Sequence, residues 1–252
     1  MKYNYIKYKQ KNQPQLEIYD NYGIIIAMKR TKLKNRILPN YTKGEEIFNM
    51  VTHITGGGIG VIALTLCVIK AAFDSDAFGI VGASIFGATM IILYCMSSIY
   101  HGLSPKLTAK KVFQIIDHCS IFVLIAGTYT PIALTTIRSF SQLAGWTIFG
   151  VVWAAAALGI TLNAIDLKKY SIFSMVCYLA MGWCILSVII PTVKALTFTG
   201  SMWLLAGGIF YTLGAILYGV GSKIRYFHSI FHIFCVLGSI CHIICILFYV
   251  LV

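Results

Sequence analysis

Seven ionisable side chains stand out because they lie in, or at the edge of, long apolar stretches of the sequence. They are one aspartate and all six histidines: Asp117, His53, His101, His118, His228, His232 and His242. An Asp, Lys or Arg at the middle of a membrane span costs about 2.5–3.5 kcal/mol on insertion scales, so ionisable residues inside spans are usually functional. These side chains are therefore candidates for a chemical site.

Two of the histidines, His228 and His232, lie four residues apart. On a helix this spacing puts two side chains on one face, one turn apart, so both imidazoles can reach a single point. His101 would supply a third nitrogen, and Ser97 lies one turn before it on the same face. Three neutral imidazoles and one open position are typical of a catalytic zinc site, whereas a structural site usually has four protein ligands.

A zinc ion at such a site would define a role for Asp117. Zinc lowers the pKa of its bound water to about 7, which makes hydroxide available at neutral pH. Asp117 could orient that water, accept its proton, or hold a histidine through a hydrogen bond.

Chance is the competing interpretation of the histidine spacing. Six histidines placed at random in 252 positions would produce an i, i+4 pair in about one chain in seven. The placement of His101 and Asp117 at the same membrane depth favours a metal site. Spacing alone leaves both interpretations open.

The other three histidines are not assigned to the site. His53 follows Glu45 and Asn49 at one-turn intervals, and a polar stripe at the bilayer edge explains this pattern as well as a site does. His242 is about 15 Å further along its helix than the histidine pair, too far to share an ion with it. His118 points about 100° away from the neighbouring aspartate on a helix.

The elements that must position these residues are membrane-spanning helices. Hydrophobic residues make up 58% of the chain and charged residues 11%, against roughly 45–50% and about 25% in soluble domains. A bilayer core needs about 20 apolar residues of helix per crossing. Seven stretches qualify: Ile47–Ile69, Phe78–Tyr100, Val112–Ile137, Leu143–Ile165, Ser171–Val193, Met202–Val220 and Phe227–Val252. The predicted fold is an all-α bundle of seven transmembrane helices.

The basic residues between these spans predict the orientation. With a cytoplasmic N-terminus, the loops on the same side hold seven of them: Lys106, Lys110, Lys111, Lys168, Lys169, Lys223 and Arg225. The loops on the opposite side hold three: Lys70, Arg138 and Lys194. Because basic residues are retained on the cytoplasmic side, the N-terminus is predicted inside and the C-terminus outside. His101, Asp117 and the histidine pair then share one depth on the cytoplasmic side.

The first 46 residues form a separate basic region. They hold half of the twenty Lys and Arg residues, and the chain's formal net charge is +12. This distribution indicates membrane orientation, not a nucleic-acid partner. We predict a disordered cytoplasmic tail over residues 1–46, with Met28 as a possible true start. Residues 47–252 would be a multi-pass domain of the cell membrane.

Several short motifs together resemble the hemolysin III branch of the progestin and adipoQ receptor (PAQR) family, within a superfamily that includes alkaline ceramidases. They are Glu45-Glu46-x-x-Asn49-x-x-x-His53, Ser97-Ser98-Ile99-Tyr100-His101, Asp117-His118, Ala126-Gly127-Thr128-Tyr129-Thr130-Pro131 and His228-x3-His232. The resemblance extends over residues 44–252, every span in order. It implies seven helices and a zinc ion near the inner leaflet, with His101, His228 and His232 as ligands.

Three functions are compatible with this resemblance. In the first, the chain is a zinc-dependent hydrolase of a membrane lipid amide or ester, with Asp117 as acid/base and Ser97 as a donor to oxyanion charge. In the second, it is a membrane-lytic or pore-forming haemolysin. In the third, it is a receptor-like membrane sensor that uses zinc structurally. The sequence predicts neither the substrate nor the oligomeric state.

Overall fold

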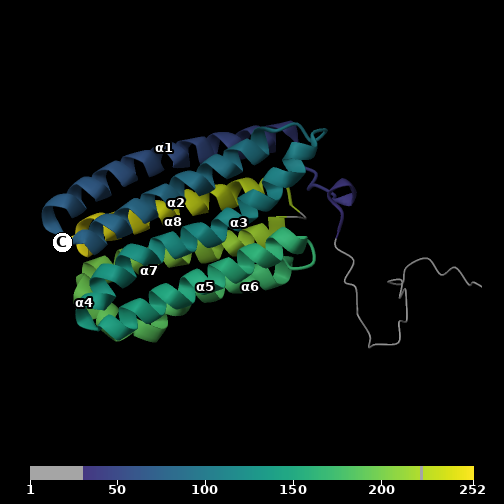
Figure 1. The fold of residues 1–252 in the computed structure, drawn as a ribbon. Helices are drawn as coiled ribbons and strands as arrows, with labels where there is room; N and C mark the ends of the chain where they lie inside the picture. The colour runs from purple at the N-terminus through teal and green to yellow at the C-terminus, as the bar shows by residue number, and fades with distance from the viewer. Residues whose placement is uncertain (1–30, 222–223) are drawn as a thin grey trace, which may run out of the picture. The chain divides into compact units, whose positions relative to one another are not determined.

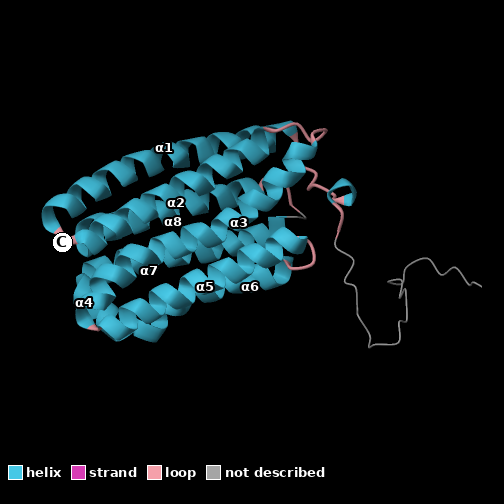
Figure 2. Cartoon of the chain, viewed as in Figure 1, coloured by secondary structure: helices cyan, strands magenta, loops and turns pink. Residues whose placement is uncertain are grey.

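The computed structural model describes residues 31–221 and 224–252. Residues 1–30 of the predicted tail lie outside the described residues. The predicted start at Met28 and most of the predicted disorder fall in this part. The described part contains helices and no strand (Figure 2). The longer helices are α1 (Lys43–Asp74), α2 (Ala77–Gly102), α3 (Thr108–Pro131), α5 (Gln142–Asp166), α6 (Ser171–Trp183), α7 (Ile189–Gly221) and α8 (Phe227–Cys245). Shorter elements are η1 (Leu33–Asn35), the π-helix η2 (Ile132–Ile137), α4 (Arg138–Phe140), the 3-10 helix η3 (Cys184–Val188) and the π-helix η4 (Ile246–Val250).

The start of α1 is set by a capping box. The Thr42 hydroxyl accepts a hydrogen bond from the Glu45 backbone N–H at 3.2 Å, and the Glu45 carboxylate accepts one from the Thr42 N–H at 2.8 Å. This satisfies two backbone donors that a helix start leaves unpaired. The second oxygen of Glu45 accepts the N–H of Tyr226 at 2.7 Å. Glu45 therefore links the start of α1 to the residue that precedes α8.

Small residues allow α1 to pack closely on α2 (Figure 1). Gly56, Gly57 and Gly60 are buried, whereas Gly58 is exposed. Gly87 of α2 also lets the two helices approach closely. A Cβ there would lie 2.6 Å from the Cα of Leu64 in α1, so no larger residue fits without moving a backbone.

Within the described residues, six helices are long and apolar enough to cross a membrane. One of them, Ser171–Gly221, has 51 residues where the sequence predicts two spans. At 1.5 Å per residue it would be about 77 Å long, against a hydrocarbon core of about 30 Å. Its backbone departs from helical geometry at Thr197, where φ is +61°. This break lies in the predicted gap between the two spans.

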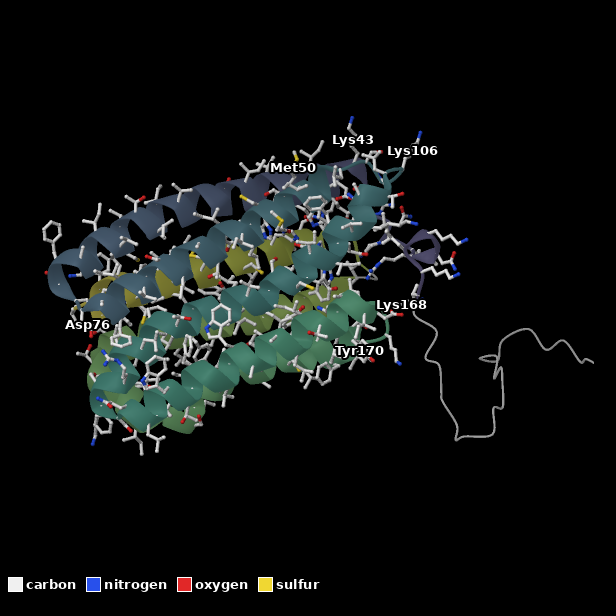
Figure 3. All side chains as sticks on the ribbon, in the orientation of Figure 1. Lys43, Met50, Asp76, Lys106, Lys168 and Tyr170 are labelled. Carbon is white, nitrogen blue, oxygen red and sulfur yellow. The ribbon has the colours of Figure 1, made fainter. Side chains whose placement is uncertain are left out.

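The helices alternate in direction, so the loops gather at two ends. Lys43, Lys106 and Lys168 lie together at one end and Asp76 at the other (Figure 3). We call the first the basic end. At the other end, Asp76 caps α2 by accepting the N–H groups of two residues in its first turn, and its second oxygen contacts the Arg138 guanidinium at 2.7 Å.

Candidate metal centre

The three histidines predicted as metal ligands come together at the basic end. His101 is in the last turn of α2, and His228 and His232 are in the first two turns of α8. One ring nitrogen from each lies within 4.8 Å of those of the other two, and all three residues are buried. The Nε2 atoms of His228 and His232 are 3.0 Å apart, as their i, i+4 spacing predicts.

These nitrogens suit a tetrahedral cation. Two nitrogens bound to zinc at about 2.0–2.1 Å lie roughly 3.3 Å apart, so the pair on α8 is close to this geometry already. The Nε2 atom of His101 is buried and has no hydrogen-bond partner, which is costly unless another group uses its lone pair. Three buried imidazoles with converging nitrogens therefore fit a zinc ion.

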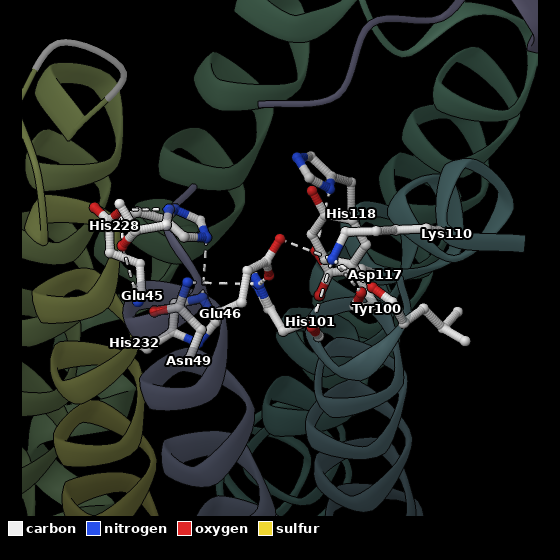
Figure 4. Close-up of polar contacts among 12 residues, drawn as sticks. Glu45, Glu46, Asn49, Tyr100, His101, Lys110, Asp117, His118, His228 and His232 are labelled. Carbon is white, nitrogen blue, oxygen red and sulfur yellow. Dashed lines mark hydrogen bonds and ion pairs between the residues drawn. The ribbon is translucent and has the colours of Figure 1, made fainter. Parts of the chain in front are cut away.

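A carboxylate that the sequence did not assign to the site holds His101. The Oε2 atom of Glu46, from the first turn of α1, is 2.7 Å from His101 Nδ1 (Figure 4). The family motif includes Glu46, but no spacing rule connects it to a residue 55 positions away. Only the packing of α1 on α2 brings the two side chains together.

Asp117 and Ser97 lie next to this cluster. Ser97 is buried, and the two side chains line the same cavity as His228 and His232. The sequence interpretation of His118 is corrected here: instead of pointing away, its Nδ1 atom lies 3.2 Å from Asp117 Oδ2. Its Nε2 atom is 3.0 Å from the Tyr218 hydroxyl. The two side chains therefore turn toward each other despite the 100° between their positions on the helix, and His118 supports Asp117.

The remaining two histidines are also placed by the structure. His53 is buried and faces the bundle interior, with its ring centroid 3.8 Å from that of His232. Glu45, Asn49 and His53, which form the polar stripe on α1, are all buried inside the bundle. His242 is deeper in the bundle, 3.3 Å from the Leu204 carbonyl, and is not among the converging ligands.

A cavity of about 200 Å³ begins at the site and continues between α3, α6, α7 and α8. Its lining away from the histidines is mostly apolar. Several lining residues are also exposed on the outside of the bundle, at η3 and α7: Leu186, Ile189 and Leu205. The cavity thus reaches from the polar cluster to the apolar surface of the helices.

Residues 31–42 form an N-terminal strap across the basic end. The Thr31 N–H donates to Asp166 at 2.9 Å, and Arg36 Nε donates to Gln114 at 3.1 Å. The Tyr41 ring stacks on the His228 ring with centroids 4.8 Å apart and planes 16° from parallel. Burial raises the pKa of the Tyr41 phenol well above its usual range, so this group is neutral at physiological pH. The strap therefore places an uncharged aromatic ring directly on a predicted ligand.

The fold and the site define a multi-pass membrane protein with a buried histidine cluster near one end of its helices. Residues 41–243 match the family model described as haemolysin-III related. The chain is 38% identical over 208 residues to Hemolysin-3 of Bacillus cereus, covering 82% of this chain and 92% of that protein. It is 38% identical over 209 residues to the Hemolysin-3 homolog of Bacillus subtilis (strain 168), covering 83% and 96%.

The chain belongs to the haemolysin III family. This confirms the resemblance inferred from the motifs, and wider PAQR membership is consistent with it. The prediction of a multi-pass protein of the cell membrane is also confirmed. The matched region starts at Tyr41, at the end of the strap.

Proposed function

We propose that this chain binds zinc through His101, His228 and His232 and hydrolyses an amide or ester bond of a membrane lipid. The observation that carries the proposal is the convergence of three buried imidazole nitrogens within 4.8 Å, two of them from histidines that line a mostly apolar cavity. A purely structural cluster would not need an adjoining cavity. Zinc, when bound, would supply a Lewis acid and an activated water.

The protein's own groups have distinct roles in this proposal. Asp117 lines the cavity beside the histidines, where it can take a proton from the attacking water and return it to the leaving nitrogen or oxygen. His118 and Tyr218 fix the orientation of Asp117 from its other side. The Ser97 hydroxyl can donate a hydrogen bond to the oxygen that becomes negatively charged.

The cavity supports a lipid as the substrate. An acyl chain entering past Leu186, Ile189 and Leu205 would stay in apolar surroundings along the whole path to the site. In the proposed topology the histidines lie near the end of the spans, at the depth where a lipid's linkage region would be found. A soluble polar substrate would gain nothing from such a lining.

The proposal includes seven crossings and a cytoplasmic N-terminus. The break at Thr197 supports dividing Ser171–Gly221 into two crossings, because one crossing cannot accommodate 51 residues. The excess of basic residues at the basic end supports placing it in the cytoplasm. The metal site would then lie beneath the inner membrane face, and the C-terminus outside.

The test is metal analysis combined with a lipid hydrolysis assay. Purified wild-type protein is expected to hold one zinc ion per chain, and the His228→Ala variant is expected to hold far less. With metal present, the wild type is expected to cleave at least one of a ceramide, an acyl-amide and a phospholipid. Zinc-loaded protein that cleaves none of these would refute the hydrolase proposal and leave the metal site intact.

The name of the two relatives, Hemolysin-3, favours a second candidate, a membrane-lytic protein. Red-cell lysis by cells expressing the chain distinguishes the two. Lysis that disappears on gene deletion but persists in a His232→Ala variant would favour the lytic function, because it would not depend on the metal site. If lysis is lost both on gene deletion and in the His232→Ala variant, then lysis depends on the metal site.

A further inference from the structure

We propose that Glu46 positions His101 for metal binding and that the buried Lys110 holds Glu46 in place. This inference rests on the proposed zinc site and adds two residues to it that are not ligands. Its observations are two short contacts from the same carboxylate. Glu46 Oε2 lies 2.7 Å from His101 Nδ1, and Glu46 Oε1 lies 2.8 Å from Lys110 Nζ (Figure 4).

The contact between Glu46 and His101 determines which ring nitrogen is free. An ionised carboxylate can only accept hydrogen bonds, so Nδ1 of His101 must be the donor. The lone pair of the neutral ring is then on Nε2, which is buried and unpartnered. A carboxylate that accepts the second N–H of a metal-binding histidine fixes its tautomer and ring orientation and raises its basicity.

Lys110 is the second part of the arrangement. The sequence counts it among the cytoplasmic loop charges, but it is 1% exposed in the structure. Its Nζ atom is also 3.0 Å from the carbonyl oxygens of Tyr100 and Leu103, and 3.4 Å from that of His101. These carbonyls are at the C-terminal end of α2, where the helix dipole favours a cation. The ammonium thus connects α3, the end of α2 and the Glu46 carboxylate of α1.

The arrangement explains why a buried lysine and a glutamate that is only 14% exposed lie beside the histidines. A buried charge is costly unless it is paired and hydrogen-bonded. Here each charge neutralises the other, and the pair prevents the carboxylate from swinging away from His101. A salt bridge that only joined helices would require neither the contact to Nδ1 nor a free Nε2 on the other side of the ring.

Zinc affinity of the full-length protein in detergent micelles tests this inference, measured by competition with a chelator. The variants are Glu46→Gln, which keeps an acceptor but loses the charge, and Glu46→Leu, which loses both. Substituting the hydrogen-bond partner of a metal-binding histidine typically lowers metal affinity by about 10–100-fold. We expect the Gln variant to lose less affinity than the Leu variant, and both to change the visible absorption of bound Co²⁺.

Asp76→Asn is the matched control. It removes the carboxylate of another 2.7 Å ion pair, with Arg138, at the opposite end of the bundle. Its zinc affinity is expected to equal that of the wild type. Lys110→Met leaves Glu46 unpaired and is expected to destabilise the fold, so Glu46→Gln/Lys110→Met serves as the variant that removes both charges. It should fold better than Lys110→Met but bind zinc no more tightly than Glu46→Gln.

The outcomes separate this inference from the proposed function. If the wild type binds zinc and both Glu46 variants bind it equally well with the same Co²⁺ spectrum, the positioning role is refuted and the site stands. If the wild type binds zinc no better than His228→Ala, the metal site itself is refuted. A loss of affinity in both Glu46 variants but not in Asp76→Asn supports the inference.

Discussion

The imidazoles of the site differ in what holds them. His228 and His232 are neighbours on one helix, so their nitrogens approach each other whatever surrounds α8. His101 comes from a different helix and depends on Glu46 for its orientation. The site is therefore most sensitive at His101, where three helices must pack correctly for one nitrogen to be in place.

The role of Asp117 leads to a prediction at this scale. Asp117→Asn keeps the size of the side chain but removes its ability to take a proton. We expect the turnover number for the cleaved lipid to fall by about 10²–10⁴-fold. Zinc content should be unchanged, because Asp117 is not one of the converging ligands. Full turnover in this variant would rule out Asp117 as the acid/base.

Among the elements, the N-terminal strap controls one approach to the metal. Tyr41 covers His228 from the basic end. We expect Tyr41→Ala to release zinc to a soluble chelator several-fold faster than the wild type, measured by stopped-flow fluorescence. Ile37→Ala is the control, because Ile37 belongs to the same strap but is 82% exposed. Equal release rates in the two variants would show that the strap does not cover the site.

Close helix packing leads to a second prediction for the elements. In Gly87→Val the new Cβ would lie 2.5 Å from Leu64 Cβ, so α1 and α2 must separate. Overpacking of this kind costs about 1–3 kcal/mol. We expect this loss in the free energy of unfolding, measured by denaturant titration in mixed micelles.

Gly58→Val is the control for that measurement. A Cβ at Gly58 meets nothing within 4 Å, so its stability should stay close to that of the wild type. Equal stability of the two valine variants would contradict the packing of α1 on α2 described above. Because Glu46 is on α1 and His101 on α2, separation of these helices should also weaken zinc binding.

For the whole molecule, the proposed topology of seven crossings makes a prediction about access. Asp74→Cys, at the last residue of α1, should react with a membrane-impermeant thiol reagent on intact cells. Lys168→Cys, between α5 and α6, should react only after the cells are permeabilised. The wild type is the control, since its eight cysteines lie within the helical elements. The reverse labelling pattern would place the basic end outside.

Much of this architecture can be read from local sequence. A run of about 20 apolar residues identifies a span wherever it occurs, and a four-residue interval predicts that His228 and His232 face one point. The motifs also led to the correct family, which the match over residues 41–243 confirms. Each of these inferences depends on neighbours in the chain or on comparison, not on packing.

The tertiary structure alone decided the partners of the charged residues. Lys110 and Lys111 are neighbours in the first turn of α3, but the first is buried against Glu46 and the second reaches the Lys34 carbonyl. The environment of His53, the support of Asp117 by His118, and the strap over His228 likewise depend on which helices are adjacent. Hydropathy and spacing record the period of a helix. They do not record which helices are its neighbours, or the rotation that lets Glu46 contact His101 across 55 residues of sequence. Those are set by side-chain packing across helices, for which a single sequence has no local signal.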